Sequence, residues 1–357
     1  MLLHKSTKDL SRTEILHFPA TNHEFYKDNL FYMRILILGG GGFLGRRLAE
    51  ELIKNGGLAQ GELVHLTLLD IAFAEDRIQD SRLEYIRGDF SDETTITNIL
   101  QQRPDVIFHL AAIVSGEAEK NFELGMKINF HASLQLLELC RKLAIHPRLV
   151  FASSCAVFGG DVSKVVTDET VPKPRSSYGI QKAMVELLIN DYSRRGFIDG
   201  RSLRLPTIAI RPGKPNAATS SFVSSIIREP LHGKKASYPV PPETPCWILS
   251  PKRVIKNFIH AATIDEKLLG DDRVINLPGL TVSVREMIHT LEQIAGPEVT
   301  KLITYEPDAF LERIVLTWPP YFDPQRAKNL GFVSDSSVEE IIQAYIAEEG
   351  MPTTKPT

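Results

Sequence analysis

The sequence predicts an α/β fold in which helices wind on both faces of a parallel β-sheet, followed by a smaller C-terminal lobe. From Arg34 onward, short apolar runs alternate with helix-like segments, the order expected when each strand is followed by a crossover helix. The apolar runs are nearly continuous in Val, Ile and Leu, which is typical of strands buried on both faces. A glycine-rich segment joins the first strand to the first helix, where such sheets bind ligands.

Each element of the predicted sheet follows from its local pattern. Strands are expected at residues 34–38, 63–70, 83–90, 105–112, 148–154, 198–209 and 273–279, the last returning to the sheet from the C-terminal part. Helices are expected at residues 43–56, 92–103, 126–144 and 178–196. Gly56 suits the C-cap of the first helix, and Pro104 ends the second. Residues 33–212 are therefore predicted to form the sheet domain.

The amino-acid composition and the pattern of apolar residues change after residue 212. The segments "PTIAIRPGKPNAATSS" and "ASYPVPPETPCW" are rich in Pro, Ser and Thr, and short helical segments follow them. Because long loops in a compact domain are often binding loops, we expect residues 213–357 to form a smaller substrate-binding lobe. Residues 1–32 have no regular period and no signal-peptide core, so we interpret them as an N-terminal extension.

The overall composition argues against several classes of partner. The net charge of −3 on 357 residues gives no reason to expect nucleic acid or an anionic membrane. No apolar run approaches the roughly 18–20 residues that a membrane span requires. Cys140, Cys155 and Cys246 are scattered and odd in number, which argues against a disulfide framework or a structural zinc. We therefore expect a cytoplasmic protein with no metal, membrane or nucleic-acid partner.

The glycine-rich segment has the spacing of a dinucleotide-binding turn. Its three glycines stand at G-x-x-G-x-x-G, and the alternative is a merely flexible turn. Glycine lets the backbone approach a pyrophosphate closely, and the following helix N-terminus offers free N–H groups, so a Rossmann-type fold is predicted. Asp70 ends the second strand, where a carboxylate accepts hydrogen bonds from the adenosine ribose and repels a 2′-phosphate, so NAD is predicted over NADP. The expected cofactor contacts in the turn are Gly39, Gly42, Phe43, Leu44 and Gly45.

Two further strand ends supply candidate cofactor contacts. Asp89 and Phe90 follow the third strand and are expected to flank the adenine ring, although Asp89 equally suits a turn or a helix N-cap. Ala111 and Ala112 are small enough to let the fourth strand pass close to the cofactor. We interpret His109, within that strand, as a packed histidine and not as a base.

A tyrosine and a lysine share one face of the helix expected at 178–196. Tyr178 and Lys182 are four residues apart in "SSYGIQKAMVELL", and positions i and i+4 of a helix point the same way. The plainer interpretation is an exposed tyrosine beside a solvated lysine. A free tyrosine has a pKa near 10 and is a poor base at neutral pH. A neighbouring ammonium and the positive nicotinamide ring both favour the phenolate and lower that pKa. We therefore predict Tyr178 as a general base, and we interpret the tail "AMVELL" as the buried apolar stripe of the helix.

The order of the motifs resembles a known superfamily. Over residues 33–280, the glycine turn, Asp70, "HLAA", "SSCAVFG" and "YGIQK" resemble the extended short-chain dehydrogenases/reductases. The resemblance implies that Ser154, five residues before Gly159, is the catalytic hydroxyl that holds the substrate oxygen, with Ser153 as its structural neighbour. Phe158 stands where the family usually has tyrosine, a departure expected to alter packing more than chemistry.

The same resemblance implies the remaining roles. Tyr178 would take the hydroxyl proton while hydride leaves for the nicotinamide, and Lys182 would also bind the nicotinamide ribose. Asn129 would anchor a water relay behind the lysine, or else pack within its helix, and Pro206 would contact the cofactor. In the superfamily, the helices corresponding to 128–143 and 183–196 form a four-helix interface, so a homodimer is expected.

The choice of reaction within the superfamily depends on finer patterns. Cys155 and Ala156 stand where dehydratases need an acidic pair, and no nucleotide clamp of the epimerase type is evident. The segments "RLPTIAIRPGKPNAATSSFVSSIIREPL" and "AAIVSGEAE" resemble a narrower group, the NAD-dependent D-erythronate dehydrogenases. The resemblance implies oxidation of D-erythronate at C2 to the 2-oxo acid. The alternatives are a uronate or other sugar-acid dehydrogenase, a nucleotide-sugar epimerase, and a dinucleotide-sensing regulator without catalysis.

A small acid requires a cation and several hydroxyl or amide partners. Arg211 is expected to grip the carboxylate with two parallel hydrogen bonds, although it equally suits a loop-packing arginine. Ser220 also suits the N-cap of the helix that begins at "FVSSII", and Arg204, inside a strand, suits a structural role. The remaining expected substrate contacts are Ser115, Ser154, Tyr178, Asn216, Ser220 and Ser221.

Overall fold

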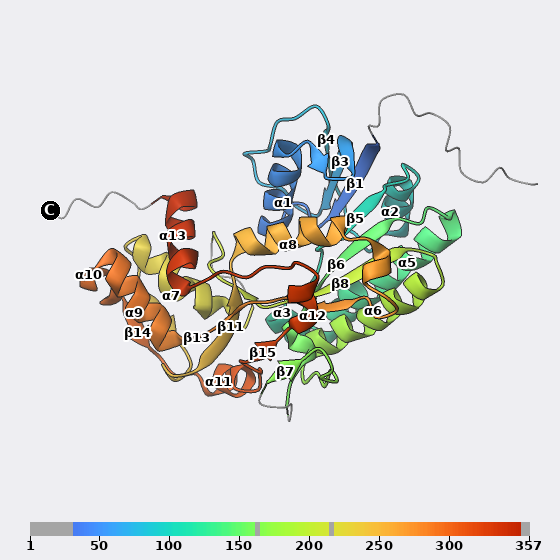
Figure 1. The fold of residues 1–357 in the computed structure, drawn as a ribbon. Helices are drawn as coiled ribbons and strands as arrows, with labels where there is room; N and C mark the ends of the chain where they lie inside the picture. The colour runs from blue at the N-terminus through green and yellow to red at the C-terminus, as the bar shows by residue number, and fades with distance from the viewer. Residues whose placement is uncertain (1–30, 161–164, 214–217, 351–357) are drawn as a thin grey trace, which may run out of the picture.

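The computed structural model describes residues 31–160, 165–213 and 218–350, and its centre is an eight-stranded sheet (Figure 1). All strand pairs in this sheet are parallel except that of the two-residue β2 with β3. The doubly wound parallel α/β fold predicted from the sequence is confirmed. Across the sheet, the strands are β12 (Val274–Asn276), β8 (Asp199–Leu205), β6 (Arg148–Ser154), β5 (Val106–His109), β1 (Tyr32–Leu38), β3 (Gly61–Asp70), β4 (Leu83–Arg87) and, also beside β3, β2 (Gly57–Leu58).

Helices bury both faces of the sheet. On β1, Ile35 and Ile37 belong to the core under α1 and α8, and the alternate residues Leu36 and Leu38 belong to the core under α2, α5 and α6. This two-sided burial is the physical reason for the near-continuous apolar runs. The helices that cover the sheet are α1 (Phe43–Lys54), α2 (Glu93–Leu100), α5 (Ala132–Leu143), α6 (Ser177–Arg194) and α8 (Pro251–Thr263).

A second hydrophobic core lies in the C-terminal lobe. It packs α7 (Ser221–Leu231), α9 (Val284–Ala295) and α13 (Val338–Glu349) against the small sheet β13-β11-β9. Two of the lobe's strands, β10 and β11, lie within a segment that the sequence predicted to be a loop. Strands can form there because the prolines of the segment lie between the two strands or at the start of one. The remaining elements are β7 (Val166–Thr167), β9 (Thr207–Ile208), β10 (Ala236–Tyr238), β11 (Pro245–Leu249), β13 (Leu280–Ser283), α10 (Pro297–Thr300), β14 (Ile303–Tyr305), α11 (Ala309–Val315), β15 (Phe322–Asp323) and α12 (Gln325–Asn329).

The chain after residue 212 serves both cores. Helix α8 packs on the large sheet through Val254 and Phe258, and β12 pairs with β8. The division into residues 33–212 and 213–357 stays a prediction about domains, and these two elements belong to the first core. Within the described ranges, no helix has the length and apolar character needed to span a lipid bilayer.

The segment before α5 departs from the long helix expected at 126–144. The chain forms α3 (Ser115–Lys120), α4 (Phe122–Gly125) and then a π-helical turn, Met126–His131, before α5 begins. A π-helical turn places one extra residue in the helix and often marks a functional region. Here it contains Asn129, whose side chain is buried.

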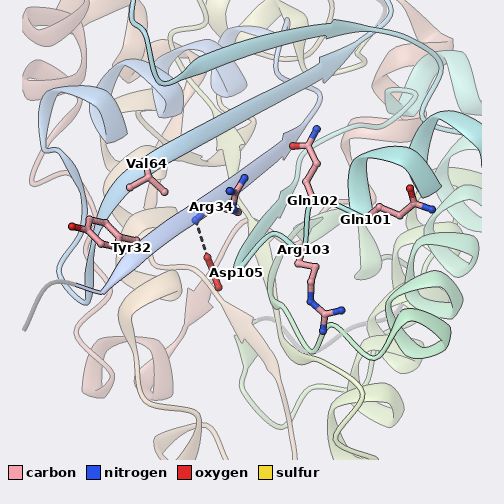
Figure 2. A pocket seen from close by; sticks show the side chains of 7 residues that line it. All are labelled: Tyr32, Arg34, Val64, Gln101, Gln102, Arg103 and Asp105. Carbon is pink, nitrogen blue, oxygen red and sulfur yellow. Dashed lines mark hydrogen bonds between the residues drawn. The ribbon is translucent and has the colours of Figure 1, made fainter. Parts of the chain in front are cut away.

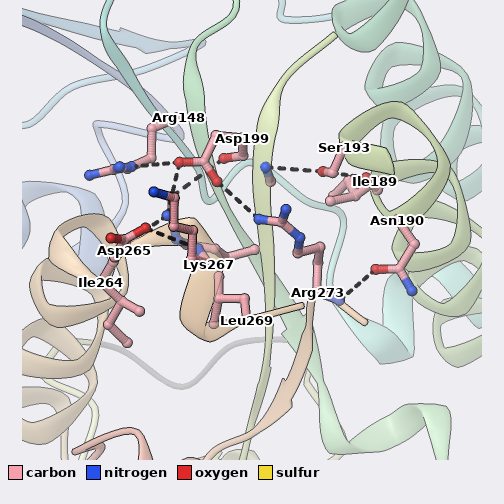
Figure 3. Close-up of polar contacts among 12 residues, drawn as sticks. Arg148, Ile189, Asn190, Ser193, Asp199, Ile264, Asp265, Lys267, Leu269 and Arg273 are labelled. Atoms are coloured by element: carbon pink, nitrogen blue, oxygen red, sulfur yellow. Dashed lines mark hydrogen bonds and ion pairs between the residues drawn. The ribbon is translucent and has the colours of Figure 1, made fainter. Parts of the chain in front are cut away.

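A charge cluster joins the amino ends of β6, β8 and β12 (Figure 3). The carboxylate of Asp199 accepts hydrogen bonds from Arg148 (Nε, 2.9 Å), Arg201 (Nη2, 2.9 Å) and Arg273 (Nη1, 3.2 Å). Arg201 is completely buried, and its Nη2 also donates to the carbonyl oxygen of Ile264, 2.9 Å away. One carboxylate therefore offsets the positive charge of three guanidinium groups. The cluster lies at the amino ends of the strands, opposite the carboxyl ends where ligands of such folds bind.

Candidate active site

Two hollows lie at opposite ends of the sheet. The one at the amino end of β1 has a volume of about 770 Å³, and its Asp105 carboxylate already accepts the Arg34 backbone N–H at 2.8 Å (Figure 2). The larger cavity, about 1130 Å³, lies at the carboxyl ends of β6 and β8 and is lined by Ser154, Tyr178 and Arg211. Since the residues predicted for chemistry meet in the larger cavity, it is the candidate active site.

The glycine turn is shaped by close backbone contacts. Gly39 has φ = +84°, and a Cβ there would lie 2.8 Å from the backbone nitrogen of Ala111. A Cβ on Gly45 would collide with the carbonyl oxygen of Gly39, so α1 can pack directly on the turn only without a side chain. Gly42 is the N-cap of α1 and supplies no side-chain cap, which leaves N–H groups of the first helical turn available to an anionic ligand.

The carboxylate of Asp70 lies against this turn. Its Oδ2 accepts the backbone N–H of Gly41 at 2.9 Å, and its Oδ1 accepts that of Ala72 at 3.3 Å. These two bonds leave further acceptor positions on the carboxylate. A turn without side chains, an uncapped helix N-terminus and an adjacent carboxylate together fit the pyrophosphate and ribose of a dinucleotide.

Asp89 and Phe90, the two residues expected at the adenine ring, have different surroundings. Asp89 accepts hydrogen bonds from the backbone N–H and hydroxyl of Ser91, at 2.8 and 2.7 Å, in a turn, which was its alternative role. The Phe90 ring is buried and packs edge-on against His109, 4.9 Å between centroids, so only the Phe90 backbone can flank a ligand. His109 itself contacts Ser133 through Nε2 at 2.8 Å, and burial lowers its pKa to about 3, in agreement with a packed neutral histidine.

The catalytic trio predicted from the sequence comes together where β6 ends. Helix α6 begins at an N-cap, Ser176, and carries Tyr178 and Lys182 on the face toward β6. The Lys182 Nζ is buried, donates to the carbonyl oxygen of Ala152 at 2.8 Å, and lies 5.6 Å from the centre of the Tyr178 ring. Ser154 and Tyr178 line the cavity together. The assignment of chemistry to these residues stays a prediction, and their proximity agrees with it.

The electrostatics of the trio differ from the expectation that Lys182 lowers the pKa of the tyrosine. Burial raises the pKa of Tyr178 to about 12, against the opposing effects of a hydrogen bond with Ser154 and the charge of Arg211. Burial also lowers the pKa of Lys182 to about 7, opposed by Glu186. In this arrangement desolvation outweighs the attraction of the neighbouring cation Arg211. The lowering expected from Lys182 together with a nicotinamide ring stays a prediction.

A buried ion pair behind the lysine was missed from the sequence. Glu186 is 2% exposed, accepts Arg204 Nη2 at 2.7 Å and Nε at 3.0 Å, and accepts the hydroxyl of Ser153. The interpretation of "AMVELL" as a purely apolar stripe is wrong at Glu186. Its position four residues after Lys182 on the same helical face was the signal that indicated a role.

Asn129 connects the π-helical turn to its surroundings. Its side chain accepts the backbone N–H of Ile113 at 2.8 Å and donates to the Ile113 carbonyl at 3.1 Å and to Gln181 Oε1 at 2.8 Å. These bonds join the segment after β5 to α6, a structural role that differs from the packing within its own helix named as the alternative. The water relay stays a prediction, and Gln181 is a residue that sequence reasoning did not find.

Arg211 lies on the wall of the cavity facing Tyr178. Its backbone is fixed on both sides, by donation of its N–H to Ser224 Oγ at 3.1 Å and by acceptance of Arg228 Nη1 at 2.6 Å on its carbonyl oxygen. Its Nη2 is buried and has no hydrogen-bond partner in the part of the chain that the structure describes. Burial lowers the pKa of this guanidinium, whose ordinary value is so high that it stays charged. A half-buried guanidinium on a cavity wall, with one buried nitrogen left without a partner among the described residues, favours an anionic ligand.

The other expected substrate contacts surround this cation. The hydroxyl of Ser115 lies 3.2 Å from that of Thr219, a cavity residue that the sequence did not single out. Ser220 stands at the N-cap of α7, but its side chain forms no capping bond, and it lines the cavity together with Ser221. Asn216 lies outside the described residues, so its predicted contact is untested.

The chain belongs to the NAD dependent epimerase/dehydratase family, whose model matches residues 35–262. The resemblance to extended short-chain dehydrogenases/reductases is thereby confirmed, and a nicotinamide cofactor follows from the family. Among curated relatives, the D-erythronate dehydrogenase of Cupriavidus necator is 49% identical over 323 residues, covering 89% of this chain and 99% of the relative. The D-erythronate dehydrogenase of Haemophilus influenzae is 44% identical over 314 residues, covering 88% and 99%.

A solved structure shares the fold and much of the sequence. It is described as a nucleoside-diphosphate-sugar epimerase from Agrobacterium tumefaciens, is 42% identical and superposes with a TM-score of 0.86, covering 94% of this chain and 99% of that one. L-Threonine dehydrogenase from Phytophthora infestans, at 24% identity and a TM-score of 0.77, shares the fold.

Proposed function

We propose that the chain is an NAD-dependent dehydrogenase that oxidises the C2 hydroxyl of D-erythronate to the 2-oxo acid. The main support is one juxtaposition, the guanidinium of Arg211, whose buried Nη2 has no partner among the described residues, in the same cavity as Ser154 and Tyr178. A sugar acid has a carboxylate that can bind Arg211 and a secondary alcohol that can bind Ser154 and Tyr178. The two relatives that match almost the whole chain are themselves named D-erythronate dehydrogenases.

The glycine turn and Asp70 would hold the cofactor. When bound, NAD supplies the hydride acceptor of the reaction. The N-terminus of α1 would bind the pyrophosphate, and Asp70 would bind the adenosine ribose and disfavour the 2′-phosphate of NADP. The small residue at Ala111, already in close contact with Gly39, leaves the end of β5 open to the cofactor.

The proton of the substrate hydroxyl passes to the oxygen of Tyr178 when this residue is in its phenolate form. Ser154 orients the substrate oxygen, and Arg211 fixes the carboxylate beside it, so that the C2 hydroxyl faces the phenol. The bound carboxylate neutralises Arg211, the cation that otherwise favours the phenolate. The charge that remains to stabilise the phenolate from this chain is the ammonium of Lys182.

A longer sugar acid is a second candidate substrate. The cavity of about 1130 Å³ exceeds what a four-carbon acid fills, and its lining includes Phe310, Arg313 and Trp318. A uronate would place its carboxylate on Arg211 and its ring against these side chains.

We also propose that the protein is a homodimer in which α5 and α6 meet their copies. Ile180 and Leu187 on α6 are 46% and 70% exposed and stand seven residues apart, on one face of the helix. Phe122 of α4 adds a third exposed apolar side chain. Analytical ultracentrifugation of wild type and Leu187→Glu tests this proposal, which predicts a dimer that the charge dissociates.

The function is tested with a panel of four- to six-carbon sugar acids, each assayed with NAD and with NADP. We expect NADH formation with D-erythronate, and abolition of activity in Tyr178→Phe because the base is removed. Tyr321→Phe, at an exposed tyrosine outside the cavity lining, is the matched control and should retain activity. Turnover of a nucleotide sugar with no activity on any sugar acid would overturn the proposal.

A further inference from the structure

Three ionisable side chains follow one another along the same face of α6. Tyr178, Lys182 and Glu186 are spaced by four residues each, so they form one row from the cavity into the interior. Lys182 and Glu186 are each 2% exposed. Burial of a carboxylate costs free energy unless the carboxylate is paired. The partners of Glu186 therefore determine its charge and its position.

Those partners fix the position of the Glu186 carboxylate. Arg204, which is 9% exposed on β8, donates to both carboxylate oxygens, and the hydroxyl of Ser153 donates to Oε1. Ser153 directly precedes the substrate-orienting Ser154 on β6. The guanidinium of Arg204 also lies 4.8 Å from the centre of the Phe158 ring, which restricts its own movement. The pair is therefore immobilised between the helix and two strands.

We propose that Glu186, oriented by Arg204 and Ser153, is a positioning residue that keeps the Lys182 ammonium charged beside Tyr178 during the proposed oxidation. The inference rests on the proposed function, in which Lys182 is the cation left to stabilise the phenolate. Lys182 itself bonds only to a backbone carbonyl among the contacts that the structure gives it, and its other neighbour is the face of Phe151, 4.5 Å away. Neither contact supplies a full negative charge.

The other titratable groups around this row do not supply that charge either. His109 on β5 is neutral because burial lowers its pKa to about 3, and Cys155, beside Tyr178, has its pKa raised to about 12. Burial raises the pKa of Tyr178 to about 12, so the phenol carries no charge near neutral pH, and the guanidinium of Arg211 is a cation. Among the described groups that face Lys182, Glu186 is the one that opposes the lowering of the pKa of Lys182 by burial. Its removal should therefore change the charge state of the lysine.

The two members of the ion pair should act in opposite directions. Glu186→Gln leaves the charge of Arg204 and should move the titration of Lys182 to lower pH by about one unit or more. Arg204→Gln leaves the charge of Glu186, with Lys182 as its remaining ionic partner, and should move the titration to higher pH. The double variant, which removes both charges, should titrate close to wild type.

The titration is measured without substrate, by NMR of protein carrying ¹³C-labelled lysine. The Lys182 resonance is identified by its loss in Lys182→Met. Glu340→Gln and Arg253→Gln are the matched controls, because Glu340 also pairs with an arginine (2.6 Å) and accepts a serine hydroxyl (2.8 Å), away from the site. Both controls should leave the titration of Lys182 unchanged. The alkaline limb of kcat/KM for D-erythronate with NAD, where activity falls as Lys182 loses its proton, should then shift in the same directions as the NMR titration.

Several results would overturn the inference. Shifts of the same sign in Glu186→Gln and Arg204→Gln, or no shift in either, would reduce the pair to a structural role. If a single variant does not fold, the double variant decides, and a titration far from that of wild type would contradict the inference. NMR shifts of opposite sign without any turnover of D-erythronate would instead reject the proposed function, because the NMR readout does not depend on the substrate.

Discussion

Replacement of Arg211 by methionine should reduce catalysis and leave the fold as stable or more stable. The guanidinium would form two charge-assisted hydrogen bonds to the substrate carboxylate, each contributing about 1.5–3 kcal/mol. A loss of roughly 3 kcal/mol corresponds to a fall of about 100-fold in kcat/KM for D-erythronate. In the unliganded protein the buried Nη2 has no partner within the described ranges, a desolvation cost of about 1–3 kcal/mol that Arg211→Met removes.

Steady-state kinetics and urea unfolding together test this prediction. Arg228→Met is the control for stability, because Arg228 is buried, whereas Arg211 is half-buried, and Arg228 bonds to Glu229 and to the Arg211 carbonyl. We expect Arg228→Met to lower the free energy of unfolding and Arg211→Met not to lower it. The reasoning is refuted if Arg211→Met keeps kcat/KM within threefold of wild type, or if it destabilises the fold as much as Arg228→Met does.

Three further predictions concern the cofactor, the lysine and the sheet edge. Asp70→Ala should raise the KM for NAD about tenfold and weaken the preference over NADP, since one charged hydrogen bond to the ribose is lost; an unchanged preference in paired kinetic assays would contradict this. The pKa of Lys182 is lowered from 10.5 to about 7 in the folded protein. Between pH 7 and pH 10.5 the unfolded state therefore binds more protons than the folded state, and the free energy of unfolding rises by about 1.4 kcal/mol per pH unit. Lys182→Met should lack this gain, and urea unfolding at pH 7 and 9 should show its stability relative to wild type falling by roughly 2–3 kcal/mol. Asp199→Asn should lower the free energy of unfolding by about 3–5 kcal/mol in urea, because the buried Arg201 loses its carboxylate; a loss below about 1 kcal/mol would count against the cluster.

The parts of the fold that the sequence predicted depend on local patterns. Buried strands, crossover helices and the glycine turn follow from apolar runs and from spacing within a few residues. The pairing of Tyr178 with Lys182 follows in the same way from the helical period. The π-helical turn around Asn129 was not predicted, because it depends on side-chain bonds to Ile113 and Gln181 across the fold.

The charges of the site were less accessible from the sequence because they depend on burial. A lysine four residues from a tyrosine suggests a lowered phenol pKa, but the buried position of both groups raises the pKa of Tyr178 and lowers that of Lys182. Likewise, the partner of Glu186 is Arg204, which lies on β8, the strand that follows α6. The register of β8 in the sheet determines which side of the sheet the Arg204 side chain faces. The helical period alone could place Glu186 beside Lys182 but could not identify its counter-ion.

The central claim, that hydride leaves C2 of a sugar acid for the nicotinamide of NAD, is tested most directly by isotope transfer. D-Erythronate carrying deuterium at C2 is incubated with NAD, and the reduced cofactor and the acid product are analysed by NMR. The account predicts deuterium at C4 of the reduced nicotinamide together with the 2-oxo acid. Loss of the deuterium to water, or its retention in the product acid, would contradict the account.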